Sequence, residues 1–342
     1  MGQPLPIARE RLRTLPKVEL HLHLEGTITP QQAGTLARRH GRGPDLELAR
    51  ELEQHGYPRR YRDFGHFLRT FLVTSAQLRT PDDLYEVAAA LARDRAQQHV
   101  AYTEVTFTAA THVQAGMPPG PMWEALREGL AAAPATRIGL IIDVVRDDGH
   151  AGAEQTVRLV DDADAPIVGL GLSGTEGAAP ESAFSVLRTA ADRLGLGLTV
   201  HAGETGPAAN VQAAVVDLQA DRIGHGIAAV RDPAVLRLLA TTGVPLEVCP
   251  SSNVALGLFP SLEAHPLAQL HEAGATITIG SDDPPFFATT LSEEIAHAVR
   301  LLTGGEATAA DLQIAAARAA FAPAEVRAEI TAAVEAWRAD QA

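Results

Sequence analysis

Residues 18–26 read VELHLHLEG, a mainly apolar run that carries His21 and His23. Short runs rich in Val and Ile recur along the chain, at residues 100–108, 137–146, 166–174, 196–204, 222–227, 244–253 and 275–284. Between them lie stretches of helical periodicity rich in Ala, Leu, Glu and Arg, such as 83–97, 122–132, 181–194 and 233–242. Near-continuous apolar strands that alternate with helices are typical of a parallel sheet covered on both faces. Eight such units favour a closed (β/α)8 barrel over an open doubly wound sheet.

The chain of 342 residues predicts one domain, residues 1–342, because no linker rich in Pro, Gly or Ser divides it. Two segments are additions to the eight strand–helix units of a minimal barrel. Residues 27–99, between the first and second expected strands, have the pattern of several helices, and we expect them to form a lid over the mouth of the barrel. Residues 285–342 are mostly helical in pattern and predict a set of C-terminal helices.

The composition excludes several classes of protein. A formal net charge of −14, from 28 Lys+Arg against 42 Asp+Glu, argues against nucleic-acid binding, which needs a basic face. The single cysteine, Cys249, rules out a disulfide framework, a Cys-rich zinc finger and an iron–sulfur cluster, and we expect it to be a small buried side chain. No apolar run approaches the roughly 18 residues that span a bilayer, and no secretory signal is visible. We therefore expect a cytoplasmic protein without a membrane partner; the sequence indicates no oligomeric state.

Histidines and carboxylates fall at the ends of several expected strands, where (β/α)8 barrels place their functional sites. His21 and His23 are two positions apart, so their imidazoles point to the same face of the first strand. His201 on the fifth strand and Asp282 on the eighth would complete a set of His and carboxylate ligands. Such ligands with one open water position suit zinc, with iron, cobalt or manganese as alternatives.

Two further polar residues stand beside this set. Glu204 lies three residues after His201, beyond a glycine, and could act over the metal as a general acid or base; the alternative is a surface carboxylate. His225 lies between Gly224 and Gly226, and its position allows a metal ligand, a base or a packing role.

Five motifs occur in order along the chain: PKVELHLHLEG at 16–26, TVHAGET at 199–205, RIGHGI at 222–227, LEVCPSSN at 246–253 and SDDP at 281–284. At these residues the chain resembles the adenosine/adenine deaminase family of the metal-dependent amidohydrolases. The resemblance runs from the first expected strand to the eighth, so it covers nearly the whole chain. One such motif is moderately specific, whereas five in order are highly specific.

The resemblance implies that one zinc ion per chain is bound by His21, His23, His201 and Asp282. This ion would lower the pKa of a bound water toward neutrality and so supply hydroxide for attack on C6 of a 6-aminopurine. Loss of ammonia would then leave a 6-oxopurine.

The resemblance also implies which groups hold the purine. Glu204 would protonate ring N1, and His225, together with Asp282, would orient the attacking hydroxide. Asp283 would form a hydrogen bond with N7, and the backbone N–H of Gly174 would bind N3.

The chain departs from the adenosine-specific pattern at several positions. Glu25 stands where those enzymes usually carry the aspartate that meets the ribose 5′ hydroxyl, and a longer carboxylate would crowd or redirect that group. The segment GLSGTE at 171–176 stands where they usually show DLAGDE, and it lacks the first acid of that motif. The segment PFF at 285–287 suggests an apolar wall closer to that of adenine deaminases.

The expected lid contains a cluster of arginines, Arg59, Arg60 and Arg62. Arginines suit a substrate that carries a carboxylate, although a solvated helix face is the simpler interpretation. Three substrates fit these departures: adenosine or deoxyadenosine, free adenine, and aminodeoxyfutalosine, an adenosine analogue with a carboxylate-bearing 5′ extension. We place adenosine-type nucleosides first, with aminodeoxyfutalosine among them.

Other functions on the same barrel are less consistent with the sequence. Lactonases and phosphotriesterases usually place a bridging lysine on the fourth strand to hold two metals, and Lys17 is the only lysine of this chain. A catalytically inactive relative would be expected to lose Glu204 or a metal ligand, and this chain keeps them all. We therefore expect a hydrolase acting on a C–N bond of a 6-aminopurine nucleoside or base, with another mononuclear amidohydrolase activity as the remaining alternative.

Overall fold

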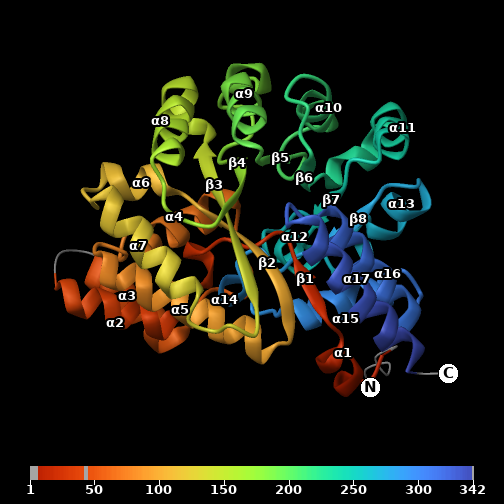
Figure 1. Cartoon of the computed structure of the whole chain (residues 1–342), viewed down its shortest axis with the longest axis horizontal. Coiled ribbons are helices and arrows are strands. Elements are labelled where there is room, and N and C mark those ends of the chain that lie inside the picture. Colours follow the sequence, from red (N-terminus) through yellow and green to blue (C-terminus); the bar gives the residue numbers. More distant parts are fainter. Residues whose placement is uncertain (1–6, 42–44, 341–342) are drawn as a thin grey trace.

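The structure is a computed structural model that describes residues 7–41 and 45–340. Its centre is one sheet of eight parallel strands in the order β1 to β8, so that strands consecutive in the chain pair with each other. The strands are β1 (Lys17–Glu19), β2 (Val100–Phe107), β3 (Arg137–Val145), β4 (Ile167–Ser173), β5 (Gly197–Ala202), β6 (Arg222–His225), β7 (Leu246–Val248) and β8 (Ile277–Ile279). This arrangement confirms the (β/α)8 barrel that the alternating pattern predicted (Figure 1).

The first and last strands meet without a regular ladder. The segments that follow β1 and β8 pair through a single bridge between Leu22 and Asp282. The backbone N–H of Asp282 donates to the carbonyl of His21 at 3.1 Å, and the N–H of His23 donates to the carbonyl of Asp282 at 3.1 Å. Gly280 permits this close approach, because a Cβ atom there would lie 2.7 Å from the Cβ of His21. The seam of the barrel therefore runs through residues that the sequence selected as metal ligands.

Helices alternate with the strands and surround the sheet (Figure 1). They are α6 (Ala109–Gln114), α7 (Pro119–Leu130), α8 (Gly149–Asp161), α9 (Ser185–Leu194), α10 (Ala208–Val216), α11 (Pro233–Thr242), α12 (Pro250–Ala255) and α13 (Leu267–Glu272). Local signals set their ends. The side chain of Asp232 accepts the backbone N–H of Ala234 at 2.8 Å and caps α11, which ends at Gly243 in the left-handed conformation. Short 3-10 helices are η1 (Glu25–Thr27), η2 (Arg146–Asp148), η3 (Glu181–Phe184), η4 (Ile227–Arg231) and η5 (Leu262–Ala264).

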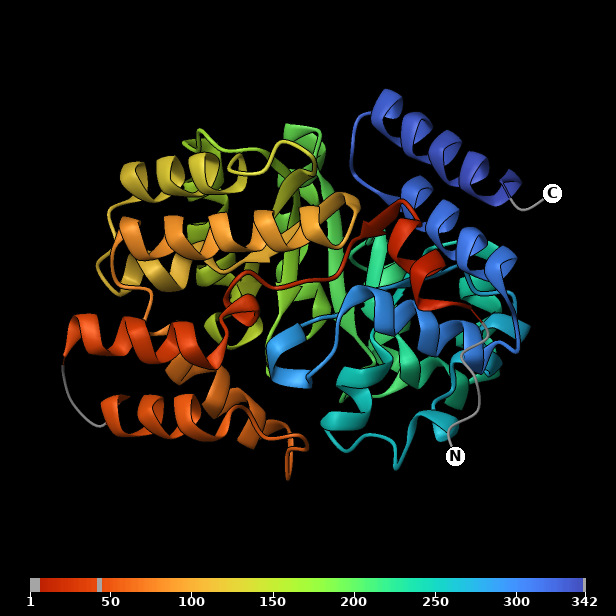
Figure 2. The same ribbon diagram turned by 90° about the horizontal axis from the view of Figure 1, so that it is seen from below.

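Further helices precede β1, separate it from β2 and follow β8. They are α1 (Arg9–Thr14), α2 (Pro30–His40), α3 (Asp45–His55), α4 (Phe64–Ser75), α5 (Pro81–Gln97), α14 (Pro284–Phe287), α15 (Leu291–Leu301), α16 (Glu306–Ala319) and α17 (Ala324–Ala339). Capping boxes formed by Thr29 with Gln32 and by Thr80 with Asp83 start α2 and α5. Figure 2 places α2 and α3, in red to orange, on the side of the barrel away from α16 and α17, in blue. Within the described ranges, no helix combines the length and apolarity needed to cross a bilayer.

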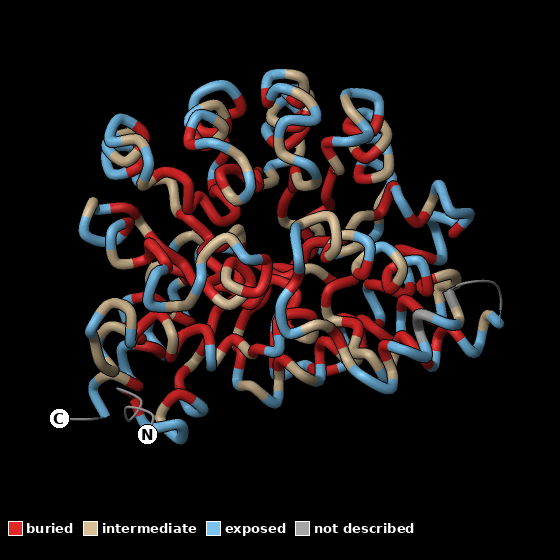
Figure 3. Tube along the Cα trace, turned by 180° about the vertical axis from the view of Figure 1, so that it is seen from behind, coloured by how far each residue is buried: buried red, intermediate tan, exposed pale blue. Residues whose placement is uncertain are grey.

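Burial follows this layered arrangement. Figure 3 shows the buried segments at the centre of the molecule and the exposed residues on the outer helices. The interior also holds charged side chains, and Lys17, Glu104 and Arg222 are each no more than 1% exposed. The Nζ of Lys17 donates to the carbonyls of Leu15 at 3.1 Å and Gln98 at 2.7 Å, which precede β1 and β2. The only lysine of the chain therefore points to the end of the barrel opposite the strand C-termini.

Candidate active site

Four side chains meet at the C-terminal ends of β1, β5 and β8. The imidazole centroid of His21 lies 5.3 Å from that of His23 and 4.6 Å from that of His201. Oδ1 of Asp282 lies 3.5 Å from Nε2 of His21 and 3.0 Å from Nδ1 of His23. One nitrogen from each of the three histidines lies within 4.8 Å of the others. The structure thus brings together the four residues that sequence spacing selected as a metal-binding set.

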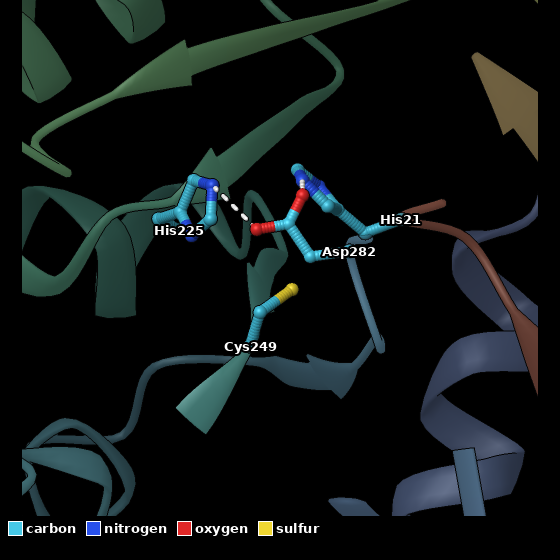
Figure 4. A group of neighbouring side chains, drawn as sticks. All are labelled: His21, His225, Cys249 and Asp282. Carbon is cyan, nitrogen blue, oxygen red and sulfur yellow. Dashed lines mark ion pairs between the residues drawn. The ribbon is translucent and has the colours of Figure 1, made fainter. Parts of the chain in front are cut away.

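The backbone is strained where two of the site residues leave their strands. His225 and Asp282 have φ angles of 63° and 62°, in the left-handed region that costs free energy for residues other than glycine. Figure 4 shows the carboxylate of Asp282 between the rings of His21 and His225, with Cys249 beside it. Nε2 of His225 lies 4.0 Å from Oδ2 of Asp282. The turns therefore aim both side chains at one centre.

His21 has the pairing expected of a metal ligand. Its Nδ1–H donates to Oε2 of Glu247 at 2.8 Å, which leaves Nε2 to face Asp282. Nε2 of His21 and Nδ1 of His201 are buried, and neither has a hydrogen-bond partner among the described residues. Unpaired buried nitrogen atoms are costly, and a carboxylate behind a histidine ligand is its usual second partner. This donor set fits a divalent transition metal.

Charges at close quarters shift the pKa values of the cluster. Burial opposes protonation of His21, but the nearby carboxylates of Asp282 and Glu247 raise its pKa to about 9. Burial, together with His21 and His23, lowers the pKa of His201 well below its usual range. Burial also opposes ionisation of Asp282, but the neighbouring imidazoles of His21 and His23 hold its pKa well below its usual range. Asp282 is therefore an anion and His201 is neutral, the protonation states in which both groups bind a cation.

Cys249 lies next to the cluster but lacks the properties of a ligand. Its Sγ lies within 4.8 Å of ligand atoms of His21, His225 and Asp282. The thiol is buried and donates weakly to the carbonyl of Glu247 at 3.8 Å. Burial raises the pKa of the thiol well above its usual range, so the sulfur stays protonated. This environment is that of a small buried side chain.

Glu204 and His225 lie beside the metal-binding set. Glu204 follows β5, and its Oε1 lies 3.6 Å from Nε2 of His225, the last residue of β6. Burial, followed by the charges of Asp282 and Glu176, raises the pKa of Glu204 well above its usual range. A carboxyl group that stays protonated near neutral pH can donate a proton. Glu204 therefore has the environment of a general acid.

Glu176 holds the loop that carries Glu204, a role that sequence reasoning missed. Its Oε2 accepts the backbone N–H of Gly203 at 2.7 Å. Its Oε1 accepts those of Glu204, Thr205 and Gly206 at 2.8, 2.9 and 3.0 Å. Several charge-assisted hydrogen bonds to one carboxylate fix the backbone of this loop. The signal in the sequence was the acid that the GLSGTE segment retains.

A chain of hydrogen bonds fixes the tautomer of His225. The backbone N–H of Leu267 donates to Nδ1 of His265 at 3.2 Å, so Nε2–H of that ring donates to Oδ1 of Asn253 at 3.0 Å. The amide of Asn253 then donates to Nδ1 of His225 at 3.3 Å. Burial, and the charge of His21, lower the pKa of His225 to about 3. The neutral ring carries its proton on Nε2, so it faces the site as a hydrogen-bond donor.

A cavity of about 140 Å³ opens beside the cluster. Gly174 and polar residues from the ends of the strands line it; the polar residues are His23, Glu25, Asp143, Ser173, His201, Glu204, His225, Asp282 and Asp283. One apolar wall comes from α4, through Phe64, Phe67, Leu68, Phe71 and Leu72. The cavity therefore joins the expected substrate-binding residues to three of the four expected metal ligands, His23, His201 and Asp282.

Asp283 reaches the cavity beside His23. Oδ1 of Asp283 lies 3.2 Å from Nδ1 of His23, and burial, with the charge of Asp282, raises the pKa of Asp283 to about 6. Gly26 makes room for this side chain, because a Cβ atom at that position would lie 1.7 Å from Oδ1 of Asp283. Gly26, in the segment that follows β1, thus leaves space for a side chain in the segment that follows β8.

Glu25 lines the cavity, but protein groups hold its carboxylate. Oε1 accepts the backbone N–H of Thr108 at 3.1 Å and lies 3.1 Å from Nε2 of His112 in α6. Burial opposes ionisation of Glu25, but the contact with His112 lowers its pKa. The longer side chain therefore reaches a neighbouring helix as well as the cavity.

The apolar wall differs from the one that the sequence suggested. Phe286 stacks on Tyr57 with ring centroids 3.9 Å apart, and it packs behind the lining residue Phe67 at 6.0 Å. The three arginines at residues 59–62 are exposed, and none of them lines the cavity. The wall is therefore built by α4, and the arginine cluster lies outside it.

Comparison with known proteins identifies the family. The family model for adenosine deaminase matches residues 16–337. An aminodeoxyfutalosine deaminase of Streptomyces avermitilis is 36% identical over 331 residues, which cover 95% of this chain and 92% of that protein. An adenine deaminase of a Chelativorans species is 34% identical over 321 residues, which cover 92% of this chain and 97% of that protein.

The solved structures agree with the sequence relatives. The crystal structure of an adenine deaminase from Arthrobacter aurescens matches with a TM-score of 0.88 and 30% sequence identity, and the match covers 95% of this chain and 99% of that chain. The likeness therefore includes the barrel and the helices added to it. The chain belongs to the adenosine deaminase family, a group of metal-dependent amidohydrolases that hydrolyse C–N bonds.

Proposed function

We propose that this protein is a zinc-dependent hydrolase that removes the 6-amino group of a purine nucleoside. In this reaction the oxygen of one water molecule forms a bond to C6, and the bond between C6 and the amino nitrogen breaks. One proton of the water ends on ring N1 of the 6-oxopurine product. The other leaves with the amino group as ammonia, so atoms and charge balance without a redox partner.

The metal-binding set would hold one zinc ion through His21, His23, His201 and Asp282. When bound, zinc supplies the Lewis acidity that lowers the pKa of water toward neutrality. Nε2–H of His225 and the carboxylate of Asp282 lie 4.0 Å apart and orient the attacking water between them. Glu247 keeps His21 in the tautomer that presents Nε2 to the centre.

The other lining residues act on the purine. Glu204 donates its proton to N1, so that negative charge does not accumulate on the ring as C6 is attacked. The carboxyl group of Asp283 forms a hydrogen bond with N7, and the backbone N–H of Gly174 donates to N3. Glu25, held by His112, forms the wall beside the substituent on N9.

One observation carries this proposal: His23, His201, Asp282 and Glu204 line the same cavity, so metal ligands and a proton donor reach one substrate. Glu204→Gln tests it, because the amide keeps the size of the side chain but cannot give up a proton in the same way. We expect this variant to retain one zinc ion per chain and to lose at least about 100-fold in kcat. Full activity would refute the acid role, and a fully active protein without zinc would refute the metal assignment.

The wall of α4 favours aminodeoxyfutalosine among the nucleosides. Its aromatic side chains, including Phe64 and Phe71, offer an apolar surface to a 5′ extension of the sugar, and the Streptomyces relative is named for this substrate. The test is kcat/KM of the zinc-loaded protein for adenosine, adenine and aminodeoxyfutalosine. A higher value for adenine than for either nucleoside would contradict the nucleoside assignment.

Three expectations from the sequence stay predictions. They are the single-domain organisation of residues 1–342, the lid role of residues 27–99 and the cytoplasmic location. For the lid, the described structure supports a wall function of α4, since its side chains line the cavity.

A further inference from the structure

Asp143 lies near the end of β3 and has no part in the proposed chemistry, yet it lines the same cavity. Its side chain is 1% exposed. Its Oδ2 accepts the hydroxyl proton of Ser173, whereas its Oδ1 has no hydrogen-bond partner among the described residues. An ionised carboxylate offers about four acceptor sites, so most of the acceptor capacity of this buried group is unused.

Asp143 takes the place of an acid that β4 lacks. β3 and β4 pair so that Asp143 lies opposite Gly171, the first residue of the GLSGTE segment. A Cβ atom at Gly171 would lie 2.5 Å from Oδ1 of Asp143. In the motif that this segment resembles, an acid stands at the glycine position. The glycine leaves space for the carboxylate of the neighbouring strand, so the negative charge at this point of the barrel comes from β3.

We propose that Asp143 is a substrate-binding residue that accepts a hydrogen bond from a ring hydroxyl of the sugar of the nucleoside. A buried carboxylate without enough donors is unfavourable, so a donor that arrives with the substrate forms a strong hydrogen bond there. Since Asp143 lines the cavity, the cavity is the side from which that donor reaches it. This inference rests on the proposed function, because it places a nucleoside in that cavity.

The neighbours of Asp143 locate the donor on the substrate. Ser173, which donates to Asp143, directly precedes Gly174, the residue assigned to N3. N3 and N9 are both bonded to C4 of the purine, so a sugar on N9 lies beside the residue that holds N3. The 2′ and 3′ hydroxyls are the ring hydroxyls of that sugar, and adenosine shares both of them with its 5′-substituted analogues.

The test combines variants of Asp143 with substrates that lack one hydroxyl. kcat/KM is measured on zinc-loaded protein for adenosine, 2′-deoxyadenosine and 3′-deoxyadenosine. With adenosine we expect Asp143→Ala to lose about 10- to 100-fold, as for a hydrogen bond to a charged group, and Asp143→Asn to lose less. With the deoxynucleoside that lacks the bound hydroxyl, variant and wild type should differ by less than about threefold.

Controls separate this role from damage to the fold. Zinc content and thermal unfolding are measured for each variant, and Asp161→Ala removes an exposed carboxylate of α8 that pairs with Arg193. Asp143→Asn keeps the side-chain volume, so it carries the test if Asp143→Ala does not fold. Equal losses for all three substrates would overturn the role, as would a wild type that deaminates adenine but no nucleoside. A wild type that deaminates no 6-aminopurine would instead refute the proposed function.

Discussion

Two clusters of buried charged groups lie inside the barrel, and they differ in how fully their atoms are paired. In the deeper cluster, Nη2 of Arg222 lies 2.5 Å from Oε2 of Glu104, and its Nε lies 2.5 Å from Oε1 of Glu247. Nη1 of Arg222 donates to the carbonyl of Ala319 at 2.9 Å, and the guanidinium stacks over the ring of Phe321 at 3.6 Å. Each nitrogen of this guanidinium therefore has an acceptor.

At the rim of the barrel, the pairing is incomplete. Nε2 of His21 and Nδ1 of His201 are buried without a partner among the described residues. Glu247 belongs to both clusters, since its Oε1 faces Arg222 and its Oε2 accepts from His21. Complete pairing is expected of a cluster that supports the fold, whereas the unpaired nitrogen atoms at the rim are available to a ligand.

His201→Ala tests the rim and has the largest expected effect. Loss of one nitrogen ligand should reduce the zinc content, and kcat/KM should fall by at least about 1000-fold, because the metal supplies several kcal/mol of charge stabilisation. The free energy of unfolding of the metal-free protein should change by less than about 1 kcal/mol, since the variant also removes an unpaired buried nitrogen. Urea unfolding with a chelator present measures this free energy. A much lower midpoint for the variant than for the wild type would show that the rim also supports the fold.

Arg222→Met tests the deeper cluster. It leaves the carboxylates of Glu104 and Glu247 buried without their cation, so we expect the free energy of unfolding to fall by about 3–5 kcal/mol. Arg137→Met is the matched control, because Arg137 forms an exposed ion pair with Glu329 at 2.9 Å and should cost less than about 1 kcal/mol. Equal midpoints of urea unfolding for the two variants would show that the deeper cluster does not support the fold.

Glu247→Gln sharpens the comparison at the residue that both clusters share. A neutral amide behind His21 should weaken zinc affinity by about 10- to 100-fold, as removal of such a supporting carboxylate does in metal sites. Glu104→Gln removes the other carboxylate partner of Arg222 but does not contact the metal-binding set, so it should lower stability and keep zinc affinity. Competition with a chelator measures both affinities; an equal loss in the two variants would show that the clusters act as one.

Glu294 of α15 is intermediate between the fully paired deeper cluster and the incompletely paired rim, because it is buried and bonded only to neutral groups. Its substitution has the smallest expected effect. The N–H of Ser251 donates to its Oε2 at 3.1 Å and the hydroxyl of Thr289 donates to its Oε1, while burial raises its pKa from 4.5 to about 7. As pH rises from about 4.5 to about 7, the unfolded chain loses this proton first, so stability falls across that window and stays level outside it.

Glu294→Gln should remove this contribution, so the free energy of unfolding of the variant should not show this fall between about pH 4.5 and about pH 7. The free energy of unfolding of wild type and variant is compared by urea titration at several pH values from 4 to 8. Thr290→Ala, which changes an exposed neighbouring hydroxyl of the cap of α15, should keep the slope of the wild type. The same pH slope in Glu294→Gln would contradict the assignment.

The barrel could be predicted because its signals are local. Apolar runs bounded by polar strand ends mark each β unit, and a spacing of two puts His21 and His23 on one face whatever the rest of the chain does. β1, β7 and β8 are shorter than the runs that predicted them, with three residues each, because the polar ends of those runs leave the ladder to build the site.

The supporting groups could not be predicted, because their partners depend on strand register and on backbone atoms. Glu176 binds the N–H groups of a loop that begins 27 residues later, and N–H groups leave no mark in a sequence. Asp143 matters because it lies opposite Gly171, which only the pairing of β3 with β4 reveals. The wall from α4 likewise depends on how the helices between β1 and β2 pack against the barrel.

The bridge between Leu22 and Asp282 joins segments that lie 260 residues apart in the chain. Contacts of such high sequence separation carry the largest loop-closure entropy. An ion bound by His21, His23 and Asp282 would stabilise that contact, in the way that a cross-link between distant residues restricts the unfolded ensemble. The ligands of the site would then also hold the first and last strands of the barrel together.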